Sequence, residues 1–317
     1  MWQEMRDDYH VISPVTTGVK EEDMIRLVKQ FRAVRPKKVI ICNDAETSGA
    51  GEKGAVATAT ELHTTLYNDY YEEATERGDE AKDADKTAKS RMPFITIATL
   101  RRPPELDKID VADYIANGHT DELEYWLEGA RSLTQYRQWQ EGNPRRFFTY
   151  ENRRTKFRPK FLADELRNDT YFSYQGQLLY RYENGVYSPD IGDTPKLIQK
   201  KLGSEWGRGH KGEALEYIQE CDATYEEHAV DTFIVNLKNG LLDLNLDGDA
   251  PILRPHTPYH KGTMQFNAEW DKKADCPNIS AFLEDIVHPE DVPLLLELAG
   301  YCMLDTAVLH KLSLIHI

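Results

Sequence analysis

The feature that most constrains the fold is a short apolar run that ends in acidic residues. Residues 37–42, KKVIIC, read as a buried strand and stop at Asn43-Asp44. Helical patterns flank this run at residues 20–34 and 51–74, a second strand is predicted at 92–100, and a short helix at 111–118. Strands that alternate with helices require crossover connections, so we expect an α/β fold with a mostly parallel sheet flanked by helices.

Residues 76–91, ERGDEAKDADKTAKSR, interrupt this alternation with a charged stretch that lacks an apolar face. Such a segment has little apolar surface to bury. We therefore predict a solvated helix extension or a loop there.

Composition excludes several classes of protein. The chain has 317 residues and a formal net charge of −15, which argues against a protein that coats DNA nonspecifically. No apolar run reaches the roughly 18 residues of a membrane helix, and the first ten residues do not resemble a signal peptide. The four cysteines lie far apart without a C-x-x-C pair, which fits a reducing cytoplasm and excludes zinc-finger spacing.

Two acidic residues follow the strand at 37–42. Asp44 and Glu46 are two positions apart, so on extended chain both side chains point to the same side. The carboxyl ends of parallel strands are where open sheets bind ligands. Two close carboxylates favour a cation between them, and Mg²⁺ prefers carboxylate, phosphate and water oxygens. We therefore predict a metal site at Asp44 and Glu46.

A second acidic group follows the strand at 92–100. Asp110 and Asp113 in the run DKIDVADYI are predicted to complete the metal site, since phosphoryl transfer requires several oxygen ligands. For Asp44 and Glu46, the structural alternative is ordinary turn chemistry or a helix N-cap.

The glycines after Glu46 suggest a phosphate loop only in part. GAGEKGA, residues 49–55, lacks the G-K-[ST] ending of a Walker loop, because Gly54 and Ala55 follow Lys53. Residues 49–54 match G-x-G-x-x-G, but they follow the acidic turn instead of the strand itself. Lys53 remains a candidate phosphate contact.

The first part of the chain resembles a known catalytic domain. VIICNDAETSGAGEKGAVATATEL followed by DKIDVADYI is similar to the Toprim (topoisomerase–primase) domain of primases and primase-like proteins of phages, plasmids and archaea. The resemblance implies primer synthesis with Mg²⁺ held by the first acidic pair, which in that family is D-x-D and here is Asp44-Ala45-Glu46. It also implies an earlier strand that ends in a glutamate, before a helix and the strand at 10–15. We expect that glutamate to lie upstream of Met1.

A basic, aromatic-rich segment separates the two halves of the chain. Residues 131–160 contain nine Lys or Arg against two acidic residues, with aromatic side chains between them. Basic groups that follow phosphates and aromatic rings that stack on bases are typical of single-stranded DNA contacts. The predicted contacts are Arg145, Arg146, Arg153 and Arg154. The alternative is a linker whose arginines pair with acidic neighbours.

The second part of the chain resembles another family. KFLADELRNDTYFSYQGQLLYRYENGVYSP, FIVNLKNGLLDLN and FLEDIVHPEDVPLLLELAGYCML are similar to the domain that precedes the superfamily 3 helicase core in phage and plasmid primase–helicases and poxvirus-type replication proteins. The patterns in this part of the chain predict α+β structure, with tight turns at Asn184-Gly185 and Asn239-Gly240. The Walker string G-x-x-x-x-G-K-[ST] does not occur in the sequence, so we expect the ATPase core to be absent from it.

These readings divide the chain into residues 1–136, a Toprim-like domain without its first strand; residues 137–158, a basic linker; and residues 159–317, the α+β domain that precedes a helicase. The predicted function is that of a fragment of a mobile-element replication primase–helicase of the cytoplasm. Its expected partners are single-stranded DNA, ribonucleotides, other replication proteins and, in the intact protein, further copies in a homo-hexamer. Two alternatives stay open: a non-catalytic DNA-binding and oligomerisation module of a replicative helicase, and an unrelated α/β enzyme with an acidic pocket.

Overall fold

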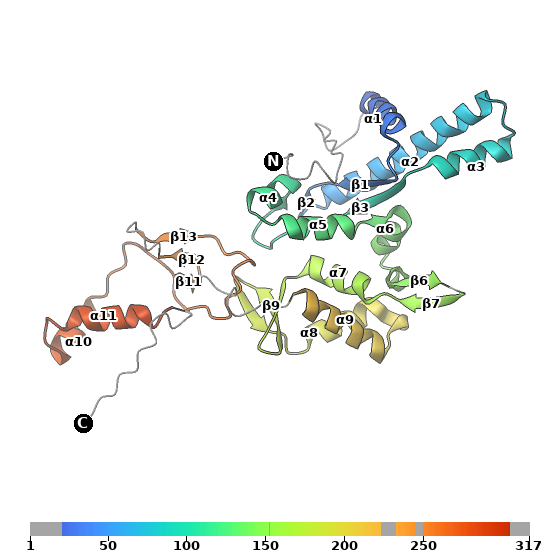
Figure 1. Ribbon diagram of the computed structural model, residues 1–317. Coiled ribbons are helices and arrows are strands. Elements are labelled where there is room, and N and C mark those ends of the chain that lie inside the picture. The colour runs from blue at the N-terminus through green and yellow to red at the C-terminus, as the bar shows by residue number, and fades with distance from the viewer. Residues whose placement is uncertain (1–20, 152, 223–232, 245–249, 305–317) are drawn as a thin grey trace. The chain divides into compact units, whose positions relative to one another are not determined.

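The computed structural model describes residues 21–151, 153–222, 233–244 and 250–304 (Figure 1). The chain divides into two compact units. Unit 1 comprises the residues up to Asp169 together with Gln199–Gly207, and unit 2 comprises Thr170–Ile198 and the residues from Arg208 onward. Helices and short sheets occur in both, which confirms mixed α/β content. The strand expected at 10–15 lies outside the described residues.

Unit 1 is built on a three-stranded sheet in the order β1-β3-β5. β1 (Lys38–Cys42) and β3 (Phe94–Ala98) run parallel, whereas β5 (Arg131–Ser132) pairs antiparallel with β3. In its described residues the sheet is therefore mixed, although a mostly parallel one was expected. The parallel pair requires a crossover connection, which places the carboxyl ends of β1 and β3 at one edge of the sheet.

Two helices pack against this sheet. α1 (Glu21–Val34) buries Met24, Val28 and Phe31, which recur at helical spacing as the sequence predicts. α2 (Ala50–Glu76) contributes Leu62 and Leu66 to the same core. Each such leucine is worth about 1.5–3 kcal/mol of transfer free energy when fully buried. This packing fixes the start of α2 beside the end of β1.

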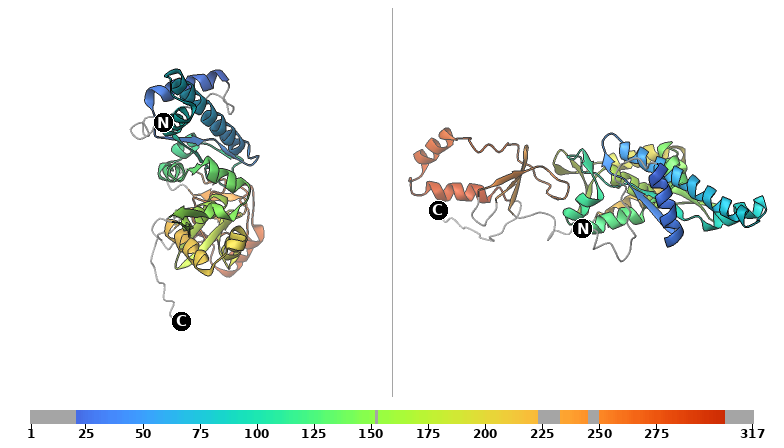
Figure 2. Two further views of the ribbon diagram at one scale, coloured as in Figure 1. Left: turned by 90° about the vertical axis from the view of Figure 1, so that its right-hand side faces the viewer. Right: turned by 90° about the horizontal axis from the view of Figure 1, so that it is seen from above.

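The charged stretch at 76–91 differs from its prediction. It forms α3 (Ala81–Arg91), which runs alongside α2 (Figure 1 and Figure 2) and buries Ala84 and Ala88. These alanines are four positions apart and lie on one helix face. Their small side chains allow close approach of two helices, a kind of contact that a search for large apolar residues overlooks.

The remaining helices of the sheet region are short. α4 (Val111–Ala116) and α5 (Thr120–Glu128) form a second core with the carboxyl ends of the strands. Tyr114 of α4 is fully buried, and its hydroxyl donates a hydrogen bond of 2.6 Å to the carbonyl of Arg101. A two-residue pairing of β2 (Ala45–Glu46) with β4 (Lys108–Ile109) joins this region to the end of β1.

The segment predicted as a basic linker is structured and belongs to unit 1. After α6 (Leu133–Gln140) come the 3₁₀ helix η1 (Pro144–Phe147) and an antiparallel hairpin of β6 (Phe148–Glu151) and β7 (Arg154–Phe157). α7 (Pro159–Asp169) and the 3₁₀ helix η2 (Gly203–Glu205) also belong to this unit.

Unit 2 contains two antiparallel meanders. The first comprises β8 (Phe172–Gln175), β9 (Leu178–Glu183) and β10 (Val186–Pro189); the second comprises β11 (Ile234–Leu237), β12 (Gly240–Asp243) and β13 (Ile252–Arg254). The predicted turn at Asn184-Gly185 is confirmed, with φ of 52° and 82°, as a tight hairpin turn requires. The other α-helices among the described residues are α8 (Asp193–Leu202), α9 (Arg208–Cys221), α10 (Pro277–Ile286) and α11 (Val292–Tyr301).

Among the described helices, none combines the length and the apolar composition that crossing a membrane would need.

Candidate functional site

The acidic site begins where β1 ends. Asp44 follows β1 at the carboxyl edge of the sheet, and the chain then turns through Gly49, whose φ is +66°. Gly51, in the first turn of α2, passes so close that a Cβ there would lie 1.8 Å from the carbonyl oxygen of Asp44. The Asn43 side-chain amide also donates to the carbonyl of Gly51, at 3.1 Å. The glycine is therefore needed to bring α2 against the acidic strand end.

Lys108 links the two predicted acidic groups. It lies opposite Glu46 in the β2–β4 pairing, and its ammonium is 2.6 Å from Oδ2 of Asp44. The hydrogen bond to Asp44, the charge of Asp44 and then the charges of Glu46 and Asp110 raise the pKa of Lys108. Lys108 therefore contacts Asp44 directly, and the charges of two further predicted carboxylates act on it.

Asp110 and Asp113 form the capping box of α4. The amide of Asp113 donates to Oδ1 of Asp110, and the amide of Asp110 donates to Oδ2 of Asp113, both at 2.9 Å. These residues therefore fill a helix-capping role that the sequence analysis does not predict for them. The negative charge of Asp110 also contributes to the raised pKa of Lys108, which links Asp110 to the acidic site.

The negative charges at this edge affect the pKa of Cys42, the last residue of β1. Burial, and then the charges of Asp44 and Asp110, raise the pKa of its thiol to about 12. The thiol therefore stays protonated at neutral pH in the free protein and is not a thiolate nucleophile there.

Glu52 is a further acidic residue that the sequence reading missed. Glu52, Asp44 and Tyr136 line a cavity of about 10 Å³ at the ends of β1 and β3. Oε2 of Glu52 is buried there without a hydrogen-bond partner among the described residues. An acid in the first turn of the helix after the strand was the available signal, but it was read as part of a glycine loop.

The donor atoms of this site fit Mg²⁺ in chemistry. Asp44, Glu46, Asp110 and Glu52 supply carboxylate oxygens, the ligands that the ion prefers, and Glu52 has an unsatisfied oxygen. Within the described part of the chain, however, no three or more His, Cys, Asp or Glu side chains are gathered closely enough to hold an ion. The ammonium group of Lys108 supplies the positive charge beside Asp44 in this structure.

Lys53 lies in the first turn of α2, and its side chain is exposed. Its amide donates to the carbonyl of Gly49 at 3.2 Å, in the turn that leads from Glu46 into the helix. This position keeps Lys53 available as a phosphate contact, although its side chain does not line the cavity beside Asp44.

The four arginines predicted to contact DNA do not share one environment. Arg146 is buried, and its guanidinium donates two hydrogen bonds of 2.8 Å to Glu165. This arrangement matches the alternative of an arginine paired with an acidic neighbour and does not support a DNA contact by Arg146. Arg145, Arg153 and Arg154 are exposed at η1 and the β6–β7 hairpin, as contact with nucleic acid requires.

Residues 118–288, just over half of the chain, match a family model described as D5 N terminal like. The chain belongs to the D5 N-terminal-like family. This family is the domain that precedes a superfamily 3 helicase in phage and plasmid primase–helicase proteins, so the resemblance of the second part of the chain is confirmed. Among curated proteins, the comparison finds no match.

The D5 N-terminal-like region also holds a buried charge cluster around Glu165 of α7. Besides Arg146, the ammonium of Lys201 lies 2.9 Å from Oε1 of Glu165, and Arg131 lies 3.8 Å from Oε2. Burial opposes ionisation of Glu165, but the hydrogen bonds and charges of Arg146 and Lys201 together lower its pKa. The carboxylate is therefore charged at neutral pH and holds three cations together.

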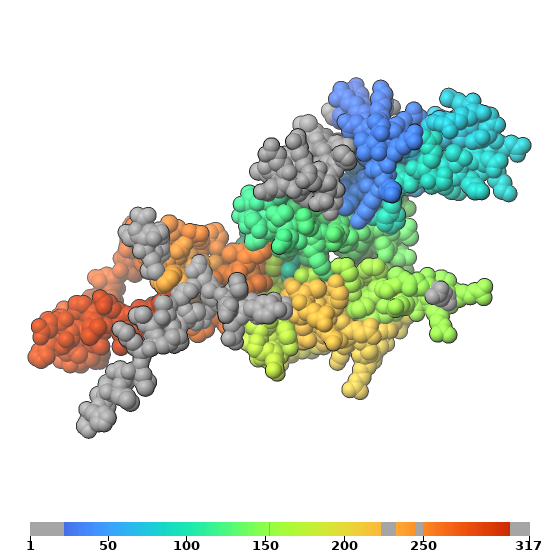
Figure 3. All heavy atoms as spheres, in the orientation of Figure 1, coloured from blue at the N-terminus to red at the C-terminus, as the bar shows by residue number. Residues whose placement is uncertain are grey.

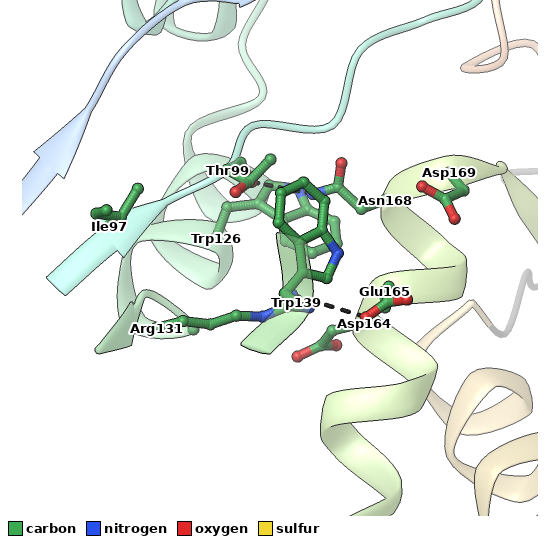
Figure 4. A pocket seen from close by; sticks show the side chains of 10 residues that line it. Ile97, Thr99, Trp126, Arg131, Trp139, Asp164, Glu165, Asn168 and Asp169 are labelled. Atoms are coloured by element: carbon green, nitrogen blue, oxygen red, sulfur yellow. Dashed lines mark hydrogen bonds and ion pairs between the residues drawn. The ribbon is translucent and has the colours of Figure 1, made fainter. Parts of the chain in front are cut away.

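A cavity of about 40 Å³ lies beside this cluster (Figure 4). In its lining, the guanidinium of Arg131 lies 5.9 Å from the ring centroid of Trp139, and the Asn168 side chain donates a hydrogen bond of 3.0 Å to the carbonyl of Thr99. The volume suits one or two water molecules and is too small for a nucleobase. We interpret the cavity as part of the internal packing of unit 1.

Proposed function

We propose that the chain acts in DNA replication as a primase–helicase protein of the phage and plasmid type, with Mg²⁺-dependent primer synthesis in unit 1. The D5 N-terminal-like family supports the link to replication. The observation that supports a catalytic role is the ion pair of Asp44 with Lys108 at the carboxyl edge of the sheet, where the charges of Glu46 and Asp110 also act on this lysine. The expected partners are single-stranded DNA and ribonucleotides in the cytoplasm.

Asp44 and Glu46, with Asp110 and Asp113 as weaker partners, are the residues we propose to hold Mg²⁺. When bound, the ion would supply positive charge that stabilises the triphosphate of an incoming nucleotide. Lys53, which is exposed at the start of α2, is the residue we propose to bind a phosphate. Lys108 neutralises Asp44, which limits the repulsion between this carboxylate and its acidic neighbours in the free protein.

The test is incorporation of labelled ribonucleotides on a single-stranded template with and without Mg²⁺. Asp44→Ala should abolish incorporation, because it removes the carboxylate at the centre of the site. Asp79→Ala is the matched control, since Asp79 is an exposed acid at the end of α2, and it should behave as the wild type. Activity that persists in Asp44→Ala would refute the assignment.

A second function is favoured by one observation. The carboxylate of Asp44 is paired with Lys108, and Asp110 and Asp113 satisfy each other in a capping box. Carboxylates engaged in an ion pair and a capping box have structural roles, as expected of a non-catalytic domain. In that case the chain is a DNA-binding and oligomerisation module that positions a helicase, including in a hexamer. It would bind single-stranded DNA without incorporating nucleotides, whereas the primase proposal requires both.

A further inference from the structure

The β6–β7 hairpin presents two different faces. Side chains alternate along each strand, so Phe148 and Tyr150 lie on one face with their cross-strand partners Phe157 and Thr155. The other face carries Arg154 and Lys156 opposite Glu151 and Thr149. One face is therefore aromatic and the other is mainly basic.

The base of the hairpin is fixed. The rings of Phe148 and Phe157 pack with their centroids 5.4 Å apart, and Phe157 is buried. On the other face, Nε of Arg158 donates to Thr149 Oγ1 at 2.9 Å, and its guanidinium pairs with Glu151. These contacts hold the two strands in register up to the tip.

The outer part of the hairpin is exposed, and the hairpin protrudes from unit 1 in the space-filling view (Figure 3). Tyr150 is 74% exposed, which is unusual for a large aromatic side chain, whereas Tyr136 and Phe147 of the same basic segment are fully buried. An exposed ring held on a rigid hairpin offers a flat apolar face to a ligand.

The exposed charges of the same hairpin are predominantly positive. Arg153, Arg154 and Lys156 are all exposed, and the nearby carboxylate of Glu151 is already engaged by Arg158. The whole chain carries a net charge of −15, so this basic surface contrasts with the rest of the molecule. A polyanion is the ligand that such a local reversal of charge attracts.

We propose that the β6–β7 hairpin binds single-stranded nucleic acid, with Tyr150 stacked on a base and Arg154 and Lys156 neutralising phosphates. Stacking requires a base whose π-face is free, which a single strand offers and an intact duplex does not. Arg154 and Lys156 are two positions apart on one strand, roughly 7 Å, so they can reach separate phosphates. This inference rests on the proposed role in replication and assigns the DNA-contacting element.

The aromatic contribution is tested with a fluorescent oligothymidylate of 20 nucleotides and the full chain. Tyr150→Ala should weaken binding about 5- to 150-fold, the range of one base–aromatic stack, and leave its salt dependence unchanged. Tyr150→Phe should bind as the wild type, because the ring is kept. Phe94→Ala removes another exposed ring, 59% exposed on β3, and should have no effect.

The contribution of the basic face is measured by the salt dependence of binding. Arg154→Ala combined with Lys156→Ala should reduce the slope of log K against log salt by about 1.4, which is 0.7 for each of two phosphate contacts. Lys82→Ala combined with Lys86→Ala removes the same charge from the exposed surface of α3 and should leave the slope unchanged. A 20-base-pair duplex should bind without sensitivity to Tyr150→Ala.

Wild-type affinity and salt slope in both hairpin variants would overturn the proposal, as would failure of the wild type to bind the oligonucleotide. The nucleotide-incorporation assay of Asp44→Ala tests primer synthesis separately from binding by the hairpin. Loss of binding in the hairpin variants together with no nucleotide incorporation by the wild type would support the hairpin and refute primer synthesis. Incorporation that depends on Asp44, with hairpin variants that bind normally, would refute the hairpin alone.

Discussion

Glu52 carries an unsatisfied carboxylate oxygen inside the acidic site. A buried polar atom without a partner costs about 1–3 kcal/mol, whereas an acid in the first turn of a helix gains about 0.3–1 kcal/mol. Gln keeps a polar atom at this place but removes its charge, and burial without a partner costs a charged group more than a neutral one, so we expect Glu52→Gln to stabilise the protein by up to about 1 kcal/mol. The same change should weaken Mg²⁺ binding, because a neutral amide replaces a carboxylate beside Asp44.

This prediction is checked by thermal unfolding with increasing Mg²⁺. Glu52→Gln should melt at a higher temperature than the wild type without the ion and gain less from its addition. Glu61→Gln is the control, since Glu61 is exposed on the same helix and should change neither quantity. An unaltered response to Mg²⁺ in Glu52→Gln would exclude Glu52 from the site.

Sequence reasoning at the residue scale found the acids and missed what surrounds them. Asp44 and Glu46 were recognisable because they follow an apolar strand directly. Lys108 and Glu52 were not, because their positions depend on the β2–β4 pairing and on the start of α2 against the strand end. Contacts of that kind are tertiary and leave no periodic pattern in the sequence.

At the scale of elements, α4 allows the structural and chemical roles of Asp110 to be separated. Asn caps a helix about as well as Asp, whereas Ala loses about 0.5–2 kcal/mol. Asp110→Asn should therefore keep the stability of the wild type, and Asp110→Ala should lose roughly 1 kcal/mol in urea unfolding. Both should lower nucleotide incorporation, because both remove a charge that reaches Lys108.

The comparison of these two variants decides the role of Asp110. Full incorporation by Asp110→Asn would show that the residue serves only as the cap that accepts from the amide of Asp113. Equal stability of the Ala and Asn variants would show instead that the capping hydrogen bond contributes little.

Elements were predicted well where large apolar residues mark them and poorly where they do not. The helical spacing of Met24, Val28 and Phe31 identified α1. α3 was read as solvated, since Ala84 and Ala88 are too small to mark an apolar face. The β6–β7 hairpin falls in the predicted basic linker because Gly142 and Pro144 interrupt regular structure there, while the hairpin itself depends on the packing of Phe148 against Phe157.

At the scale of the whole molecule, the Glu165 cluster ties together segments that are distant in sequence. Arg131, Arg146, Glu165 and Lys201 come from β5, η1, α7 and α8, and all belong to unit 1. No local pattern predicts such a cluster, because each residue alone reads as an ordinary surface charge. Its formation explains why residues 199–207 belong to unit 1 although they follow a segment of unit 2.

Breaking this cluster should be costly. Glu165→Gln leaves the buried guanidinium of Arg146 without its anionic partner, and removal of one member of a buried pair costs about 3–5 kcal/mol. Urea unfolding at neutral pH should show a loss of that size. Glu151→Gln, in the exposed pair with Arg158, is the control and should cost less than about 1 kcal/mol.

The pH dependence of stability follows from the direction of the Glu165 shift. Its folded pKa lies below the ordinary value of 4.5, so the folded protein binds the proton less readily than the unfolded chain. The stabilisation by Glu165 is therefore complete above pH 4.5 and is lost as the pH falls through the lower folded pKa. The difference in unfolding free energy between wild type and Glu165→Gln should be constant near neutrality and shrink below pH 4.5. A difference that stays constant down to strongly acidic pH would mean that the cluster does not hold Glu165 ionised, and that the destabilisation arises from packing alone.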